Sequence, residues 1–439
     1  MMKAVLSRAG SALLTSRALR DTRRAVHALH RRVKGGAPTV LYFHQADDPY
    51  SQIAAQALSA IAARYKVALV SMLVSPPEDS AAPERAMLRA YALRDAPRLA
   101  AEYGFEFPAN AASPDAPLVA LCNAVLLAAK TRGTFFEVAP LAGRALFAGD
   151  AAALRDLAAK HGASEPEAVA HSLAEGDAMR KRLGHYLGGM FYFEGEWYWG
   201  IDRLCHLEAR LASIGLDSLP KGAAQIAPRR DMRLIAFPKG GPRLVIDYWF
   251  SFRSPYSWIS FPRMKKLAHH YDAELRLRFI LPMVMRGLPV PRVKRMYIML
   301  DTKREAELAG IPFGTVVDPV GAGAERALAV LHRAMKLGRG EDFAELGQRA
   351  AFADGIDLAS DAGLYDVARR AGLDEAAVKA ALGDESWRPV AEENRKALFA
   401  AGLWGAPTFR VNDMPAHWGQ DRFWALEEDI LGILEGAKP

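Results

Sequence analysis

Cysteine is scarce in this chain. Its 439 residues include two cysteines, Cys122 and Cys205, which lie 83 positions apart and form no C-x-x-C motif. A dithiol oxidoreductase needs two neighbouring sulfurs, one to attack a mixed disulfide and one to resolve it. Their absence disfavours a protein-disulfide oxidoreductase, and the sparse use of cysteine fits a reducing compartment. Cys122 lies in an apolar segment and is expected to be a small buried side chain.

Long apolar runs are also missing. No uninterrupted run approaches the roughly 18 residues that a membrane-spanning helix needs, and residues 11–14 are too short and too polar for the core of a secretory signal. The sequence contains no glycine-rich phosphate loop and no Ser-His-Asp motif. His185, His269 and His270 have no partner at metal-ligand spacing, so no metal site is expected.

Acidic residues are scarce at the start of the chain. Residues 1–34 hold nine Lys or Arg and a single acid, Asp21, and so carry +8, whereas the whole chain carries +7. The remainder is therefore close to neutral, which argues against nucleic acid as a partner. The arm, residues 1–35, is rich in Arg, Ser and Ala and has Val26, Leu29 and Val33 at helical spacing, which resembles a mitochondrial transit peptide. A basic surface helix and a poorly ordered arm are the alternatives. We expect a cytoplasmic protein, or a mitochondrial one if the arm is a transit peptide.

The length predicts two domains, and the two halves of the sequence repeat one pattern. Residues 39–51 and 244–257 each read as an apolar strand, a polar turn and a Pro-Tyr-Ser sequence that opens a helix. Residues 192–204 and 410–423 each read as a hairpin ending in Trp-Gly-x-Asp-Arg. The Pro-Tyr-Ser pairs lie 206 positions apart and the Trp-Gly pairs 219, so a tandem duplication is predicted.

Between these motifs the apolar residues follow a helical period, which predicts a helical insertion in each half. The segments are 116–130, 151–160 and 166–173 in the first half and 324–335, 342–352, 364–371 and 375–382 in the second. Asp115, Asp361 and Asp374 are the expected N-cap or entry residues of three of them. The predicted division is an arm (1–35), a first domain (36–220), a linker (221–242) and a second domain (243–439), all of an α/β class.

Two segments of the second half carry the candidate chemistry. Ser254 is predicted to cap a helix that Pro255 opens, so a hydroxyl would lie at a helix N-terminus, where the backbone N–H groups favour an anion. In the second segment, a cis peptide bond before Pro407 would turn the Ala406 backbone outward as a hydrogen-bonding edge. Together the segments suggest a thiolate site whose sulfur is not a protein cysteine.

With these motifs in order, the second half resembles the DsbA-like branch of the thioredoxin superfamily, and within it the 2-hydroxychromene-2-carboxylate isomerases and kappa-class glutathione transferases. The resemblance covers residues 244–435 and rests on four stretches of sequence. They are Ser254-Pro255-Tyr256-Ser257, Gly405-Ala406-Pro407-Thr408-Phe409, Trp418-Gly419-Gln420-Asp421-Arg422, and Lys294 and Tyr297 followed by Asp301 and Arg304. It implies two tandem thioredoxin-like domains, each with a helical insertion.

The resemblance also implies glutathione as the cofactor and a small aromatic or unsaturated compound as the substrate. Ser254 would hydrogen-bond the sulfur of glutathione, and the resulting thiolate would act as a nucleophile. The expected cofactor contacts are Phe252, Lys294, Ala406, Pro407, Gln420 and Asp421, and the expected substrate contacts are Tyr256, Trp258 and Arg286. A homodimer is a further expectation.

The sequence departs from the family at several places. The loop 283–289 lacks the Asn that the family usually shows, and Arg286 is the residue that would compensate for it. In the first half Asp48 stands where Ser254 stands in the second, and Gly188-Gly189-Met190 stands for Ala406-Pro407-Thr408. A carboxylate would repel a thiolate, so the first domain is expected to be structural or regulatory.

The same residues are compatible with a protein that has no catalytic role. Ser254 and Asp421 could simply cap helices, and one of Tyr256 and Trp258 must pack inward. The alternative function is a non-catalytic thioredoxin-fold binding protein, or a chaperone-like one, that presents a groove to an extended peptide.

Overall fold

The chain forms two compact units, each with its own sheet. The computed structural model describes residues 2–238 and 240–436. A first unit spans Asp21–Arg229, and a second unit combines Arg230–Pro439 with Met1–Arg20. Residues 1, 239 and 437–439, which belong to the predicted arm, linker and second domain, lie outside the described residues. No helix in the described ranges is long and apolar enough to cross a bilayer.

The first unit contains a four-stranded mixed sheet in the order β2-β1-β3-β4. Its strands are β1 (Thr39–His44), β2 (Ala68–Leu73), β3 (Met190–Phe193) and β4 (Glu196–Trp199). β1 pairs in parallel with β2 and antiparallel with β3, with Phe43 opposite Met190. β3 and β4 form the predicted hairpin, with Phe193 opposite Glu196.

Helices fill the rest of the first unit, most of them between β2 and β3. They are α3 (Pro49–Ala55), α4 (Leu58–Arg64), α5 (Arg85–Glu102), α6 (Ala116–Thr131), α7 (Phe135–Phe147), α8 (Ala151–His161), α9 (Pro166–Arg182), the short η1 (Ile201–Arg203) and α10 (Leu204–Ser213). α6, α7 and α8 pack on one another. Asp115 caps α6 as predicted, since its carboxylate accepts a hydrogen bond from the Leu118 N–H at 2.8 Å.

The sheet of the second unit has the same order of strands, β6-β5-β7-β8. The strands are β5 (Val245–Phe250), β6 (Glu274–Phe279), β7 (Thr408–Val411) and β8 (His417–Trp418). β5 pairs in parallel with β6 and antiparallel with β7, with Trp249 opposite Thr408. The central strand β5 is buried because its apolar run meets helices on both sides, and Ile246, Tyr248 and Phe250 belong to one core cluster.

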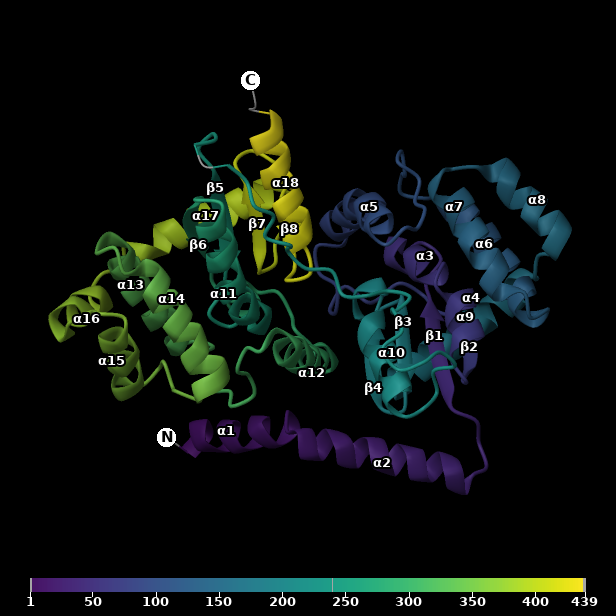
Figure 1. Ribbon diagram of the computed structural model, residues 1–439, viewed down its shortest axis with the longest axis horizontal. Coiled ribbons are helices and arrows are strands. Elements are labelled where there is room, and N and C mark those ends of the chain that lie inside the picture. Colours follow the sequence, from purple (N-terminus) through teal and green to yellow (C-terminus); the bar gives the residue numbers. More distant parts are fainter. Residues whose placement is uncertain (1, 239, 437–439) are drawn as a thin grey trace. The chain divides into compact units, whose positions relative to one another are not determined.

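The helices of the second unit include the predicted insertion between β6 and β7. They are α1 (Met2–Leu14), α11 (Pro255–His270), η2 (Met283–Arg286), α12 (Arg292–Ala309), α13 (Ala322–Lys336), α14 (Gly340–Arg349), η3 (Ala350–Asp354), α15 (Asp361–Arg370), α16 (Glu375–Leu382), α17 (Trp387–Ala400) and α18 (Phe423–Gly436). Figure 1 shows α13, α14, α15 and α16 gathered in one cluster, in agreement with their mutual contacts. The cap of α15 is Ser360, whose hydroxyl accepts from the Gly363 N–H, and not Asp361 as predicted.

The N-terminal arm is helical, with α1 followed by α2 (Arg17–Val33). α1 and the residue that follows it contact the rest of the second unit through hydroxyl groups spaced four residues apart. Ser7 Oγ donates to the Val316 carbonyl at 2.9 Å, Ser11 Oγ accepts from the Val316 N–H at 2.8 Å, and Thr15 Oγ1 donates to the Gly314 carbonyl at 3.3 Å. Among the described side chains of this segment, these three therefore hold it to a loop backbone by hydrogen bonds.

Candidate functional site

Ser254 lies at the junction of β5 and α11, where the sequence predicts a helix cap. Its backbone is extended, and Pro255 occupies the first helical position. The Ser254 Oγ accepts a hydrogen bond from the Ser257 N–H at 3.1 Å and donates one to the Ala406 carbonyl at 2.9 Å. Because the side chain is only half-buried, it presents a hydroxyl at the N-terminus of a helix of 16 residues.

The segment 404–408 lies directly against this hydroxyl. The Ala406–Pro407 peptide bond is cis. The Trp404 ring packs on Trp418 with ring centroids 4.8 Å apart, and Thr408 Oγ1 donates to the Gly405 carbonyl at 2.8 Å. A Cβ on Gly405 would approach Trp418 Nε1 to 2.6 Å, so only glycine fits against the indole. The loop is thus held from its far side while the Ala406 carbonyl faces Ser254.

Arg286, in η2, also reaches the loop. Its Nη2 donates to the Trp404 carbonyl at 2.9 Å, and its side chain is half-buried. The structure therefore brings this predicted residue to the Ala406–Pro407 segment. The guanidinium binds backbone of the protein itself and so contributes to the shape of the loop.

Tyr256 is anchored to α12, which packs on α11. Its hydroxyl donates to Asp301 Oδ2 at 2.7 Å, and the fully buried Asp301 also accepts from Arg304 Nη2 at 3.3 Å. The Tyr256 ring remains half-buried.

Lys294 lies seven residues before Asp301 on α12. That spacing is two helical turns, so Lys294 shares the helix face that meets Tyr256. Its side chain is half-buried, and burial lowers the pKa of the ammonium group to about 8. A lysine in this state carries a poorly hydrated positive charge near neutral pH.

Gln420 is placed differently from the expectation. It is buried with 1% of its surface exposed, and its amide oxygen accepts from Arg263 Nη1 at 2.6 Å. Its Nε2 donates to Glu305 Oε2 at 3.0 Å and to the half-buried Asp421. The Gln420 amide is thus engaged inside the protein, and Asp421 is the member of the pair that reaches the surface.

Phe252 and Trp258 lie in the core, with 1% and 2% of their surface exposed. Phe252 packs on Phe343, and the Trp258 indole N–H donates to the Pro312 carbonyl at 2.8 Å. The structure places neither side chain where a ligand could touch it. Of the two aromatic residues Tyr256 and Trp258, Trp258 is the one that packs inward.

The sequence does not indicate the residues that hydrogen-bond to the Gln420 side chain. Arg263 and Glu305 are both buried charged residues, on α11 and α12. Arg263 also pairs with Asp231 at 2.6 Å and lies over the Phe423 ring at 4.2 Å. Because these partners lie more than 100 positions from Gln420 in the sequence, no local spacing pattern indicates them.

In the first unit, Asp48 is the N-cap of α3, the helix that follows β1. Its carboxylate accepts from the Tyr50 N–H at 3.3 Å, the Ser51 N–H at 2.9 Å and the Ser51 hydroxyl at 2.7 Å. Burial raises the pKa of this carboxyl group to about 6. A Cβ on Gly189 would come within 3.2 Å of Asp48 Oδ2, so the glycine loop lies close against the carboxylate.

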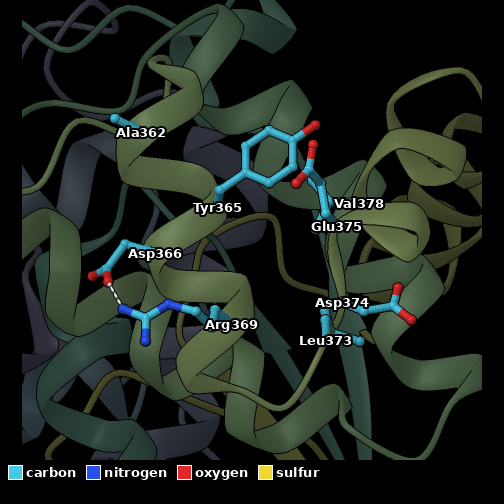
Figure 2. Close-up of a pocket in the computed structure, with 8 residues that line it drawn as sticks. All are labelled: Ala362, Tyr365, Asp366, Arg369, Leu373, Asp374, Glu375 and Val378. Atoms are coloured by element: carbon cyan, nitrogen blue, oxygen red, sulfur yellow. Dashed lines mark hydrogen bonds and ion pairs between the residues drawn. The ribbon is translucent and has the colours of Figure 1, made fainter.

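A pocket lies elsewhere, between α15 and α16 in the helical insertion of the second unit. It has a volume of about 430 Å³ and is lined by Ala362, Tyr365, Asp366, Arg369, Leu373, Asp374, Glu375 and Val378 (Figure 2). Its charged groups are engaged in local pairs, for example Arg369 with Asp366 at 2.7 Å and Glu375 with Lys379 at 2.7 Å. None of the predicted site residues lines it. In the described ranges, no group of three or more His, Cys, Asp or Glu is arranged to hold a metal ion.

Residues 245–431 match the DSBA-like thioredoxin domain. Two 2-hydroxychromene-2-carboxylate isomerases, from Pseudomonas sp. (strain C18) and Pseudomonas putida, are each 28% identical to the chain. The matches cover 43% and 42% of this chain and 91% and 93% of the isomerases. A solved structure of 2-hydroxychromene-2-carboxylate isomerase is 24% identical and has a TM-score of 0.39, over 44% of this chain and 97% of that one.

Proposed function

We propose that the second unit is a glutathione-dependent isomerase or transferase, because residues 245–431 match the DSBA-like thioredoxin domain and the chain is similar to two proteins named 2-hydroxychromene-2-carboxylate isomerase. Its substrate would be a small aromatic or unsaturated compound. The observation that carries the proposal is the Ser254 hydroxyl, half-buried at the N-terminus of α11 and 2.9 Å from the Ala406 carbonyl.

The Ser254 environment fits a thiolate. A free thiol with a pKa near 8.5 is only about 3% thiolate at pH 7, and lowering the pKa by about two units requires about 2.7 kcal/mol. A hydrogen bond to a charged group contributes about 1.5–3 kcal/mol, and a helix N-terminus about 0.3–1 kcal/mol. Together these two contributions reach the required magnitude.

Ser254 and the Ala406 backbone would have separate roles in binding glutathione. Ser254 keeps its cap bond from the Ser257 N–H and turns its proton from the Ala406 carbonyl to the sulfur. The Ala406 backbone offers a hydrogen-bonding edge to the tripeptide. Bound glutathione would supply a nucleophilic sulfur that adds reversibly to the unsaturated substrate.

Two further groups would position the ligands. The ammonium group of Lys294, on the α12 face that meets Tyr256, would hold an anionic group of glutathione or of the substrate. Tyr256, fixed by its bond to Asp301, would present an aromatic face to a planar substrate. Asp421 would bind the α-amino group of the γ-glutamyl end, while Gln420 supports it from inside.

We also propose that the two units arose by tandem duplication. Both sheets have the same strand order. Tyr50 donates to Asp95 at 3.0 Å just as Tyr256 donates to Asp301, and each pair is separated by 45 positions. A second tyrosine, Tyr42 or Tyr248, donates to the Ser51 or Ser257 carbonyl in the respective unit. In the first unit Asp48 would repel a thiolate, so that unit would serve a structural or regulatory role.

Two substitutions at one position test the function. Ser254→Ala removes the hydroxyl and the cap, and should cost about 1 kcal/mol of stability in addition to activity. Ser254→Asp keeps an acceptor at the cap, as in the first unit, but it can donate neither to a thiolate nor to the Ala406 carbonyl. We expect both variants to lose turnover of 2-hydroxychromene-2-carboxylate with glutathione.

The readouts are turnover, glutathione binding by calorimetry, and the ultraviolet absorbance of bound thiolate during a pH titration. Wild-type turnover in Ser254→Ala, or an unshifted pKa of bound glutathione in the wild type, would overturn the proposal. No heat with glutathione, together with binding of unfolded peptides, would instead favour a non-catalytic binding protein.

A further inference from the structure

The part of α2 that lies in the first unit packs inward through basic side chains. Arg24 makes two hydrogen bonds to the Glu196 carboxylate, at 3.1 and 2.9 Å, and Arg31 makes one to Glu194 at 2.7 Å. His27, between them on the same face, lies against Gly195. The inner face of the helix therefore forms ion pairs with the hairpin of β3 and β4.

The outer face of the same stretch is apolar. Val26, Leu29 and Val33 are 60%, 62% and 78% exposed. In a helix on a globular protein the apolar stripe normally meets the core, and here it points away from it. No buried residue is found along the described side chains of α2. Single exposed apolar residues are ordinary, but three that line one face of a helix form a patch.

Positive charge borders this patch on both sides. At 100° per residue, Arg23 and Arg32 lie about 90° to either side of the line through Val26, Leu29 and Val33. Both are exposed, and Lys34 follows directly after the helix. Asp21 is the single acidic residue in the arm. The outer face thus combines an apolar centre with basic edges.

We propose that this outer face of α2 binds the surface of a bilayer that contains anionic lipids. An interfacial helix buries its apolar side at the boundary of headgroups and acyl chains while arginine side chains reach back to the phosphates. The arrangement of Val26, Leu29 and Val33 between Arg23 and Arg32 meets both requirements. A second copy of the protein, bound through the outer face of its own α2, is a less suitable occupant. Such an isologous contact would place basic edges against basic edges.

The test is co-sedimentation of the full chain with vesicles of phosphatidylcholine alone and of phosphatidylcholine mixed with phosphatidylglycerol. We expect binding to the mixed vesicles, weakening as salt is raised. Arg23→Gln combined with Arg32→Gln should lower the partition coefficient by more than about tenfold, since each basic residue near an anionic surface contributes about fivefold. Val26→Gln combined with Leu29→Gln should lower it by a similar or larger factor.

All four substituted side chains are exposed, so the variants should keep the melting temperature of the wild type. Ile214→Gln is the matched control, since Ile214 is an exposed apolar residue of the first unit outside α2, at 49%. It should leave vesicle binding unchanged. No binding to mixed vesicles at low salt overturns the proposal. So does a lipid-independent dimer, seen by analytical ultracentrifugation, that Leu29→Gln dissolves, because the second copy would then be the occupant.

Discussion

At the scale of single residues, Gly405 shows how closely the site loop is fitted. An added Cβ would meet the rigid Trp418 indole at 2.6 Å, a distance that the ring cannot relieve by changing a flexible torsion. Gly405→Ala should therefore destabilise the second unit by about 1–3 kcal/mol and displace the Ala406 carbonyl from Ser254. Denaturant unfolding and glutathione affinity measure the two effects.

Gly432→Ala is the control for this change. Gly432 lies inside α18, and a Cβ there would meet nothing within 4 Å. Alanine favours a helix interior by about 0.8–1 kcal/mol over glycine, so this variant should be more stable than the wild type. If the two substitutions changed the free energy of unfolding equally, the contact between Gly405 and Trp418 would not be what limits position 405 to glycine.

Lys294 offers a second residue-scale prediction, in which stability and activity change in opposite directions. Burial lowers the pKa of its ammonium group to about 8, whereas the unfolded value is near 10.5. The folded state therefore binds fewer protons between these values, and stability rises as pH increases from about 8 to 10.5. At pH 7 the charged group is disfavoured, so Lys294→Met should stabilise by about 1 kcal/mol or more.

The same variant should raise the KM for glutathione or for an anionic substrate, because the positive charge is lost. The gain in stability should disappear in unfolding curves measured near pH 10.5, where the wild-type lysine is largely neutral in the folded state. A variant that is less stable at pH 7 and retains its KM would show that Lys294 is a structural residue.

At the scale of elements, β1 carries a group that makes the first unit sensitive to acid. His44 is buried, its Nδ1 lies 3.1 Å from the Tyr42 hydroxyl, and burial lowers its pKa to about 3. Since unfolded histidine binds a proton below about pH 6.5, the stability of this unit falls as pH drops from 6.5 towards 3. His185, whose pKa burial also lowers to about 3, acts in the same sense.

Asp48 acts in the opposite sense, because its raised pKa, about 6, makes the folded state gain stability as pH falls from about 6 to 4. Comparison of the wild type with His44→Gln isolates the contribution of His44 to the pH dependence of the free energy of unfolding. At pH 5 the wild type should have lost about 2 kcal/mol more than the variant, relative to about pH 7.5. Urea unfolding at the two pH values measures this difference, and equal losses would contradict it.

The elements also show what the sequence can and cannot predict. The helical period of the apolar residues and the capping residues correctly indicate α6, α13 and α16, because these properties are local in the sequence. The inward face of α1 is not predictable from its apolar spacing, because Ser7, Ser11 and Thr15 bind a loop some 300 positions away in the sequence. For the same reason the buried partners of Gln420 escape prediction, whereas the position of Ser254 as a cap follows directly from the Ser-Pro pair.

At the scale of the whole molecule, the two units should respond differently to the proposed cofactor. A ligand at about 100 times its dissociation constant adds about 2.7 kcal/mol to the unit that binds it. Glutathione should therefore raise the temperature of one unfolding transition when the full chain is measured by differential scanning calorimetry. The other transition belongs to the first unit and is recognised by its sensitivity to acid. A shift confined to the acid-sensitive transition would contradict the assignment of the site to the second unit.

The glycine loop of the first unit limits how that unit can change over evolutionary time. Gly189 has a φ of +62°, which the proline ring does not allow, and a Cβ on Gly188 would come within 2.5 Å of Gln45 Cβ. Replacing Asp48 with serine would therefore not recreate the second unit's site, because the facing loop would have to be rebuilt at the same time. Single substitutions therefore cannot easily create such a site in the first unit.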